Sequence, residues 1–275
     1  MTVLVTGATG NIGRMVVDHL LARTDEPVRA LTVDPVRAAL SGDVEVVRGS
    51  LHRPASLDGV FDGVRALYLA PHVPTVAEVL DRAAAAGVGH VVDLSGEPES
   101  WWGTVVTAVE AAPVPWTHLW PADFVENCRM WLPQIAAHGV VREPWPDLAS
   151  TPTAMTDIAE VAAVALTAGE GYHGRALTLT GPEAVTRRRW VAAIAAATGV
   201  PIGFEQVTPD EAAAVLAGSM GADRADVVVH TVLGEFLHAG AAAPNGVVEQ
   251  VTGRPGTTVE AWATEHAGSL RAALT

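Results

Sequence analysis

The sequence of 275 residues contains no lysine, and all 17 of its basic residues are arginine. This absence excludes a lysine Schiff base, a Walker-type phosphate loop and a Tyr-x-x-x-Lys proton-transfer pair. The single cysteine, Cys128, cannot form a disulfide within the chain or a cysteine-rich metal site, so we expect no metal. One unpaired cysteine is typical of a reducing compartment, and we expect a cytoplasmic protein.

Charged residues are also scarce, at 17%, whereas hydrophobic residues make up 49%. The formal net charge is −14, and an acidic surface repels phosphate backbones, so we expect no nucleic-acid partner. No apolar run is long and uninterrupted enough to span a bilayer, and no basic, apolar leader precedes the first predicted strand. We therefore expect no membrane association. The expected partner is a small-molecule substrate, and the sequence does not decide whether the chain forms a homodimer.

Short apolar runs alternate with helical patterns over the first half of the chain. The runs predict strands at residues 3–5, 28–32, 44–47, 66–69, 91–94 and 116–119. The clearest helical patterns lie at residues 14–23, 75–86 and 104–111. Strands and helices that alternate at this spacing pair in parallel through right-handed crossovers. We therefore predict an α/β fold with a doubly wound parallel sheet.

A glycine-rich loop follows the first predicted strand and opens the first helix. Gly7 permits a tight turn, Gly10 lets the backbone approach a pyrophosphate, and Gly13 allows close packing of helix on strand. The other loop residues expected at the phosphates are Thr9, Asn11 and Ile12. The spacing is G-x-x-G-x-x-G, and the alternative is a turn that binds nothing. The strand–loop–helix context favours a Rossmann-type dinucleotide site.

The second half of the chain is predicted to be mostly helical. Helical patterns occur at residues 157–166, 187–197, 208–218, 224–238 and 257–273, with one strand at 176–180. Proline-rich connections lie near residues 144–152. We therefore predict an NAD(P)-binding domain over residues 1–150 and a smaller substrate lobe over residues 151–275, woven against the first, with the ligand in the cleft between them.

Motifs along nearly the whole chain resemble the NmrA-like branch of the atypical short-chain dehydrogenases/reductases. They are VTGATG at residues 5–10, WTHLWP at 116–121 with Phe124 and Asn127 after it, TDIA at 156–159, LTGPE at 179–183, and TGRP at 252–255 followed by Trp262. The resemblance implies a Rossmann fold and NAD(P) binding. It does not choose among reductases, redox sensors and catalytically silent proteins, because the family contains all three.

The adenosine end of the predicted site departs from that family's pattern. The family commonly places arginine after the second strand to bind the 2′-phosphate of NADP, but Val33 stands here. Arg37 can take over this role, or Asp34 can bind a ribose hydroxyl and favour NAD(H). Alternatively, Asp34 caps a helix and Arg37 is only a solvated charge. Ser50 replaces the family's aspartate beside the adenine. From the resemblance we expect NADP(H), with NAD(H) as the alternative.

Further cofactor contacts are expected after the third and fourth strands, at Leu51, Ala70 and Pro71. The superfamily's usual acid is a tyrosine assisted by lysine, and this pair is absent. His72 is the first candidate acid or base, and the alternative is a surface histidine held by the backbone.

Three more candidate catalytic residues follow the fifth and sixth strands. Ser95 lies where the superfamily keeps a serine, although it can equally be a turn or cap residue. Asp123 and Asn127 are expected on the substrate side, where a buried carboxylate can move a proton, or else they cap a short helix.

Tryptophan is concentrated in one stretch, because five of the eight lie between residues 101 and 131. The residues expected to line a substrate pocket are Trp101, Trp120, Phe124 and Trp131. Flat aromatic walls suit an aromatic or polyketide-like ligand, and ordinary core packing is the alternative. Because Trp101 and Trp102 are adjacent, they cannot both point into the core.

Three functions remain open on the sequence alone. The first is an NAD(P)H-dependent reductase of a small apolar carbonyl, enone or quinone-like substrate. The second is a non-redox tailoring enzyme of natural-product synthesis, such as a cyclase, isomerase or lyase. The third is a non-catalytic, dinucleotide-binding redox sensor.

Overall fold

The computed structural model describes residues 1–234, 237 and 241–274, which form two compact units. The first unit comprises Met1–Pro121, Met155–Leu179 and Val247–Arg254, and the second comprises Ala122–Ala154, Thr180–Gly246 and Pro255–Thr275. The predicted domains, residues 1–150 and 151–275, stay a prediction, because compactness does not show which segment folds by itself. Among the described residues, no helix is long and apolar enough to cross a membrane.

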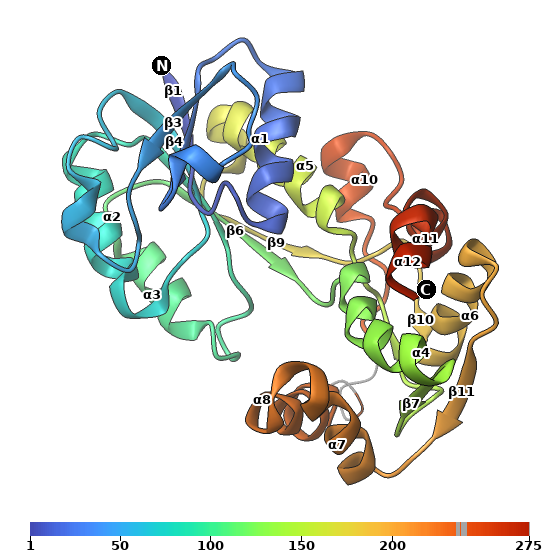
Figure 1. Ribbon diagram of the computed structural model, residues 1–275. Coiled ribbons are helices and arrows are strands. Elements are labelled where there is room, and N and C mark those ends of the chain that lie inside the picture. Colours follow the sequence, from blue (N-terminus) through green and yellow to red (C-terminus); the bar gives the residue numbers. More distant parts are fainter. Residues whose placement is uncertain (235–236, 238–240, 275) are drawn as a thin grey trace. The chain divides into compact units, whose positions relative to one another are not determined.

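A seven-stranded parallel sheet forms the centre of the first unit, in the order β3-β2-β1-β4-β5-β6-β9 (Figure 1). Its strands are β1 (Thr2–Val5), β2 (Val28–Thr32), β3 (Val44–Arg48), β4 (Val64–Leu69), β5 (His90–Leu94), β6 (Trp116–Pro121) and β9 (Arg175–Leu179). The direction of winding reverses between β1 and β4, which is where ligands bind in such sheets, beyond the carboxyl ends of the strands.

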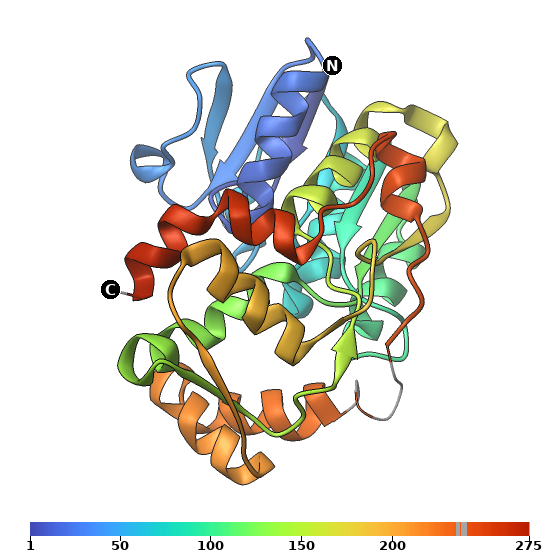
Figure 2. The ribbon, with the colours of Figure 1, turned by 90° about the vertical axis from the view of Figure 1, so that its right-hand side faces the viewer.

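Helices cover both faces of this sheet. On one face α1 (Asn11–Arg23) packs against α5 (Met155–Thr167), and Figure 2 shows the two lying side by side. On the other face α2 (Val76–Ala85) packs against α3 (Gly103–Ala111), over a core that includes Leu4 and Leu67. The helix α5 is buried nearly all round because alanine and valine dominate it, and α10 (Val247–Thr252) packs against it. The sheet thus lies between two apolar helix layers.

The second unit is mostly helical. Its helices are α4 (Leu132–His138), α6 (Arg187–Thr198), α7 (Pro209–Met220), α8 (Ala222–Asp226), α11 (Val259–Glu265) and α12 (Ala267–Leu274). Its strands form two small sheets, β8 (Ala149–Ser150) with β10 (Val185–Thr186) and β7 (Val140–Glu143) with β11 (Gly203–Gln206). The core contains Trp131, Trp190 and Trp262, each at most 1% exposed.

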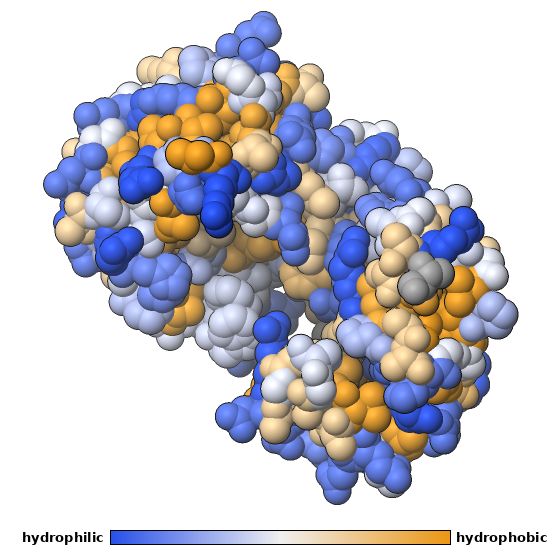
Figure 3. Space-filling model, viewed as in Figure 1, coloured by the Kyte–Doolittle hydropathy of each residue, from blue (hydrophilic) through white to orange (hydrophobic). Residues whose placement is uncertain are grey.

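The predicted doubly wound sheet is confirmed, and so is the mostly helical second half. The helix predicted over residues 257–273 is instead two helices, because the backbone leaves the helical conformation at His266. The helix predicted over residues 224–238 begins as α8 and continues as the π-helical turn η6 (Val227–Val232), and its end lies outside the described residues. Hydrophilic side chains surround scattered apolar patches on the face of the first unit that Figure 3 shows.

Candidate functional site

The loop between β1 and α1 is built so that only glycine fits. Gly7 has a φ of +60°, and a Cβ added at Gly13 would lie 2.2 Å from the Gly7 carbonyl oxygen. The Gly10 N–H donates to that same oxygen over 2.8 Å. Thr6 ties this loop to the end of β4, because its hydroxyl donates to the Tyr68 carbonyl and accepts from the Ala70 N–H.

The first turn of α1 has unused backbone donors. Its N-cap is Gly10, which supplies no capping side chain, and no acidic residue lies in that turn. The free N–H groups and the positive end of the helix dipole favour an anion there. A close loop without Cβ atoms and an uncapped helix start together fit a pyrophosphate.

The surface beyond β2 and β3 contains the predicted adenosine residues. Val33 is 64% exposed, and the exposed Asp34 and Arg37 form an ion pair of 3.7 Å, in which Asp34 makes no capping hydrogen bond. Ser50 is buried, and its N–H donates to the Ser56 hydroxyl. The charge of Arg37 is therefore paired with the Asp34 carboxylate.

A cavity of about 420 Å³ lies beside these residues, lined by Val33, Gly49 and Ser56 among others. Two arginines that sequence reasoning missed, Arg48 and Arg53, also line it. The sequence feature that could have indicated Arg53 is its position three residues after Ser50. In the structure these two residues form an isolated β-bridge. Both residues are exposed, and arginine is a residue type that binds phosphate well.

His72 follows the end of β4, after Ala70 and Pro71, and is half-buried. Its Nδ1 lies 2.9 Å from the Thr75 hydroxyl oxygen, and that hydroxyl donates to the Leu51 carbonyl over 2.6 Å. The hydroxyl oxygen must therefore accept from Nδ1–H, and Nε2 is the ring nitrogen that takes no part in this contact. The ring of His52 stacks on that of His72, with centroids 3.7 Å apart.

Ser95 follows β5 and is buried, and its hydroxyl has no hydrogen-bond partner. The nearby residues 100–103 contain the adjacent tryptophans. Trp101 is 72% exposed and stacks on Trp102, which packs against the core under α2 and α3. Trp120, on β6, is half-buried, and its indole N–H has no partner.

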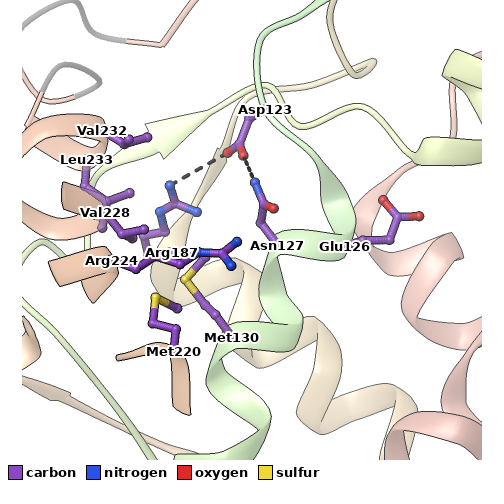
Figure 4. A pocket seen from close by; sticks show the side chains of 10 residues that line it. All are labelled: Asp123, Glu126, Asn127, Met130, Arg187, Met220, Arg224, Val228, Val232 and Leu233. Atoms are coloured by element: carbon purple, nitrogen blue, oxygen red, sulfur yellow. Dashed lines mark hydrogen bonds and ion pairs between the residues drawn. The ribbon is translucent and has the colours of Figure 1, made fainter. Parts of the chain in front are cut away.

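Asp123 and Asn127 lie together in the second unit. Asp123 Oδ1 accepts from the Phe124 N–H and from the Asn127 side-chain amide, and Oδ2 accepts from the Ser150 hydroxyl, all within 2.8 Å. Arg187 Nη2 is 3.7 Å from Oδ2 (Figure 4). Asp123, Asn127 and Arg187 line a cavity of about 260 Å³. This cavity is the second arginine-containing site that sequence reasoning missed. The run of three arginines at 187–189 was its only signal.

Burial perturbs several titratable groups outside these cavities. It raises the pKa of Tyr68 far above the usual tyrosine value, and the Tyr68 hydroxyl has no partner. It also raises the pKa of Cys128 to about 12, so this thiol stays protonated and unreactive. Trp131 donates to Glu143 and packs edge-on against Trp190 in the core. Among the described residues, no group of histidine, cysteine and acidic side chains is arranged to hold a metal ion.

The predicted site residues therefore fall into two groups. The first unit holds the glycine loop, the adenosine residues, His72 and Ser95, and the second unit holds Asp123, Asn127, Phe124 and Trp131. Within the second unit, Asp123 and Asn127 are hydrogen-bonded to each other, whereas Trp131 lies in the core. Their roles stay predictions.

Comparison with known proteins adds to this geometry. A family model described as NAD(P)H-binding matches residues 7–98, which include the glycine loop. The chain is 37% identical to a (4-alkanoyl-5-oxo-2,5-dihydrofuran-3-yl)methyl phosphate reductase of Streptomyces griseus subsp. griseus, over 96% of this chain and 98% of that protein. It is 30% identical to an NAD(P)H azoreductase of Xenophilus azovorans, over 98% of this chain and all of that protein.

The chain belongs to the NmrA-like family of atypical short-chain dehydrogenases/reductases. A solved NADPH-dependent quinone oxidoreductase of Escherichia coli, in complex with NADPH, shares the fold of this NmrA-like chain. It has a TM-score of 0.84 and 22% identity, over 96% of this chain and 99% of that one. The predicted family and the predicted NAD(P)H binding are both confirmed.

Proposed function

We propose that this chain is an NAD(P)H-dependent reductase of a small, largely apolar carbonyl, enone or quinone-like substrate. The observation that carries the proposal is the glycine cradle at the carboxyl end of β1, in a chain alignable over nearly its whole length with two named reductases. Their substrates, by name an alkanoyl dihydrofuranone and an azo compound, contain conjugated double bonds that accept electrons.

The residues present fit a nicotinamide dinucleotide. The glycine loop would hold the pyrophosphate through backbone N–H groups at Asn11 and Ile12, with Thr9 beside them. Leu51, Ala70 and Pro71, beyond β3 and β4, would flank the rest of the cofactor. When bound, the reduced dinucleotide supplies two electrons and one proton as hydride.

We propose NADPH as the preferred form, with Arg53 and Arg48 as the cations for the 2′-phosphate. They support this preference because both line the cavity beside Val33, whereas Arg37 is paired with Asp34. Arginine binds phosphate through two parallel N–H donors, which makes it the suitable residue there.

The substrate needs one proton in addition to the hydride, and we propose His72 as its donor. Thr75 orients the ring by accepting from Nδ1–H, so the proton would leave Nε2 of the doubly protonated ring, and the ring would keep its Nδ1–H after the transfer. Ser95 is the candidate hydrogen-bond donor to the substrate oxygen, because its buried hydroxyl has no partner in the protein. Asp123 and Asn127 act in the second unit as substrate-side residues.

Trp101 and Trp120 in the first unit, and Phe124 in the second, stay proposed substrate contacts, supported by their incomplete burial. Trp131 acts as a structural support, because its side chain is 1% exposed. We further propose a cytoplasmic protein that binds no nucleic acid, which the net charge of −14 supports. A homodimer is tested by size-exclusion chromatography with light scattering.

The proposed activity is tested by the loss of NADPH absorbance with a panel of substituted quinones, enones and azo dyes. We expect NADPH oxidation that depends on both enzyme and acceptor, with NADH giving a lower kcat/KM. If an acceptor is converted while NADPH absorbance stays constant, the protein is a non-redox enzyme. If NADPH quenches tryptophan fluorescence but no acceptor is converted, the sensor hypothesis replaces the reductase.

A further inference from the structure

A cavity in the second unit combines two cationic side chains with an apolar wall (Figure 4). Its volume is about 260 Å³, slightly below the range of clefts that enclose a whole small ligand. It can therefore accept one part of a ligand, such as a charged group with a short chain. The polar lining is Asp123, Asn127, Arg187 and Arg224, with Glu126 at the edge.

The guanidinium group of Arg187 is buried and has few interaction partners among the described residues. The Arg187 side chain is 4% exposed, and within the described part of the chain its Nε has no hydrogen-bond partner. The side chain forms the 3.7 Å ion pair with Asp123, and its Cζ lies 5.3 Å from the centroid of the Trp190 ring. A guanidinium carries five N–H donors, and leaving them unused in a buried place is costly. Buried groups of this kind are normally satisfied, so the free donors indicate a ligand.

The acidic residues of the lining are held by other partners within the second unit. The Asp123 carboxylate is occupied by three hydrogen bonds from Phe124, Asn127 and Ser150. Its part is to position Arg187, to which its second oxygen is paired. Glu126 accepts from the indole N–H of Trp262 over 2.9 Å, and Figure 4 shows its carboxylate turned away from both guanidinium groups.

A second arginine, Arg224, adds a positive charge to the lining of the cavity. Arg224, on α8, is exposed, and among the described residues it forms no ion pair. The two arginines come from different elements, α6 and α8, and converge on the same cavity.

The remaining wall is apolar and adaptable. It is formed by Met130, Met220, Val228, Val232 and Leu233. Methionine side chains adjust to irregular shapes, which suits an alkyl chain of variable length. Val228 and Val232 lie on the π-helical turn η6, a conformation that is rare and often found at functional sites.

We propose that this cavity binds a substrate that carries an anionic group, a phosphate or a carboxylate, next to an alkyl chain. Arg187 and Arg224 hold the anion, Asn127 and Asp123 fix the position of Arg187, and the methionine and valine side chains pack against the chain. The assignment rests on the proposed function, since it names the substrate class of that reductase.

The test uses hexyl phosphate, hexanoate, inorganic phosphate and hexanol as probes, with binding measured by isothermal titration calorimetry. We expect hexyl phosphate or hexanoate to bind at least about tenfold more tightly than inorganic phosphate and hexanol. Whichever of the two binds more tightly identifies the anion. Equal binding of hexyl phosphate and hexanol, or none by either anionic probe, overturns the proposal.

The decisive variant is Arg224→Gln, because Arg224 is exposed and its loss leaves no buried charge unpaired. We expect it to weaken binding of the anionic probe about tenfold or more, and Arg187→Gln to do the same if it folds. The matched control is Arg188→Gln, at an exposed arginine next to Arg187 that faces Asp147, and we expect it to stay within about twofold of the wild type. Unchanged binding in R224Q overturns the proposal.

NADPH titration of the same samples separates this claim from the proposed function. If NADPH binds and neither anionic probe does, the cavity assignment fails alone. If NADPH does not bind at all, the proposed function fails, and the substrate role of the cavity fails with it.

Discussion

Gly13 makes the tightest approach in the phosphate loop, and a side chain there has nowhere to go. A Cβ would lie 2.2 Å from the Gly7 carbonyl oxygen, which is backbone and cannot turn aside. We expect Gly13→Ala to displace the loop and to weaken NADPH binding about tenfold or more, as overpacking costs about 1–3 kcal/mol. The measurement is tryptophan fluorescence quenching by NADPH.

The matched control is Gly42→Ala, since a Cβ at Gly42 meets no atom within 4 Å. This variant is expected to bind NADPH like the wild type. Wild-type affinity in folded G13A, verified by circular dichroism, would contradict the placement of the pyrophosphate.

Arg53 decides between NADPH and NADH in the proposed adenosine site. Because it lines the cavity beside Val33, we expect Arg53→Gln to weaken NADPH binding about tenfold and to leave NADH binding unchanged. Arg37→Gln is the comparison, because Arg37 is 88% exposed and paired with Asp34. An equal loss for both dinucleotides in R53Q, or a larger loss in R37Q, would move the 2′-phosphate elsewhere.

His72 is predicted to deliver the proton. We expect His72→Gln to lower kcat about a hundredfold, within the usual contribution of a general acid, while NADPH affinity stays unchanged. His52→Gln removes the stacked neighbouring ring and is expected to change kcat by no more than about threefold. A kcat for H72Q equal to that of the wild type would assign the proton to another group or to water.

The glycine loop could be predicted from the sequence because its signal is local. It consists of a strand, three glycines at fixed spacing and a helix that follow one another along the chain. The arginine cavity could not be predicted. Arg187 follows Asp123 by more than 60 residues, and only the fold brings them within 3.7 Å. Arg53 was missed for a related reason, since the family pattern directs attention to Val33, just after the end of β2.

His90, at the start of β5, links elements by its imidazole. Its Nε2 lies 2.9 Å from the Thr117 hydroxyl of β6, which itself donates to the Tyr172 carbonyl, so Nε2–H donates and Nδ1 stays without a proton. Burial, with the nearby His173 and Arg65 as smaller causes, lowers the pKa of His90 from 6.5 to about 4.

This shift makes a prediction about acid stability. Between pH 6.5 and about 4 the unfolded chain binds a proton that the folded chain refuses, so the free energy of unfolding falls as the pH drops through that window. Above pH 6.5 this group has no effect. We expect His90→Gln, which keeps a donor for Thr117, to show a shallower loss in urea unfolding between pH 7.5 and pH 4.5. A pH slope equal to that of the wild type would contradict it.

The elements of the sheet could be predicted because apolar runs and helical periodicity are strong there. The second unit was harder. No element was predicted between residues 122 and 150, where η4 (Val125–Trp131), α4 and β7 occur, because these pieces are short and buried by contacts distant in sequence. Likewise, the apolar residues over 257–273 keep their helical spacing on both sides of His266, so periodicity does not reveal the break.

At the scale of the whole molecule, the first unit contains the dinucleotide cradle and the second unit contains the proposed anion-binding cavity. The chain carries a net charge of −14, so binding of anionic ligands depends on local donors: the start of α1 and the few arginines left without strong partners. Such local donors would let an acidic protein bind both a phosphate-bearing cofactor and the proposed anionic substrate.

The most direct test of the central claim follows the hydrogen that the reductase transfers. NADPH doubly deuterated at the reactive carbon of its nicotinamide is supplied with an accepted enone or quinone-like substrate, and the product is analysed by mass spectrometry. For an enone, we predict one deuterium on the reduced carbon and one NADPH consumed per product. For a quinone, whose added hydrogens exchange with water, only the stoichiometry is informative. Enone product without deuterium, or formed without NADPH consumption, would contradict the account.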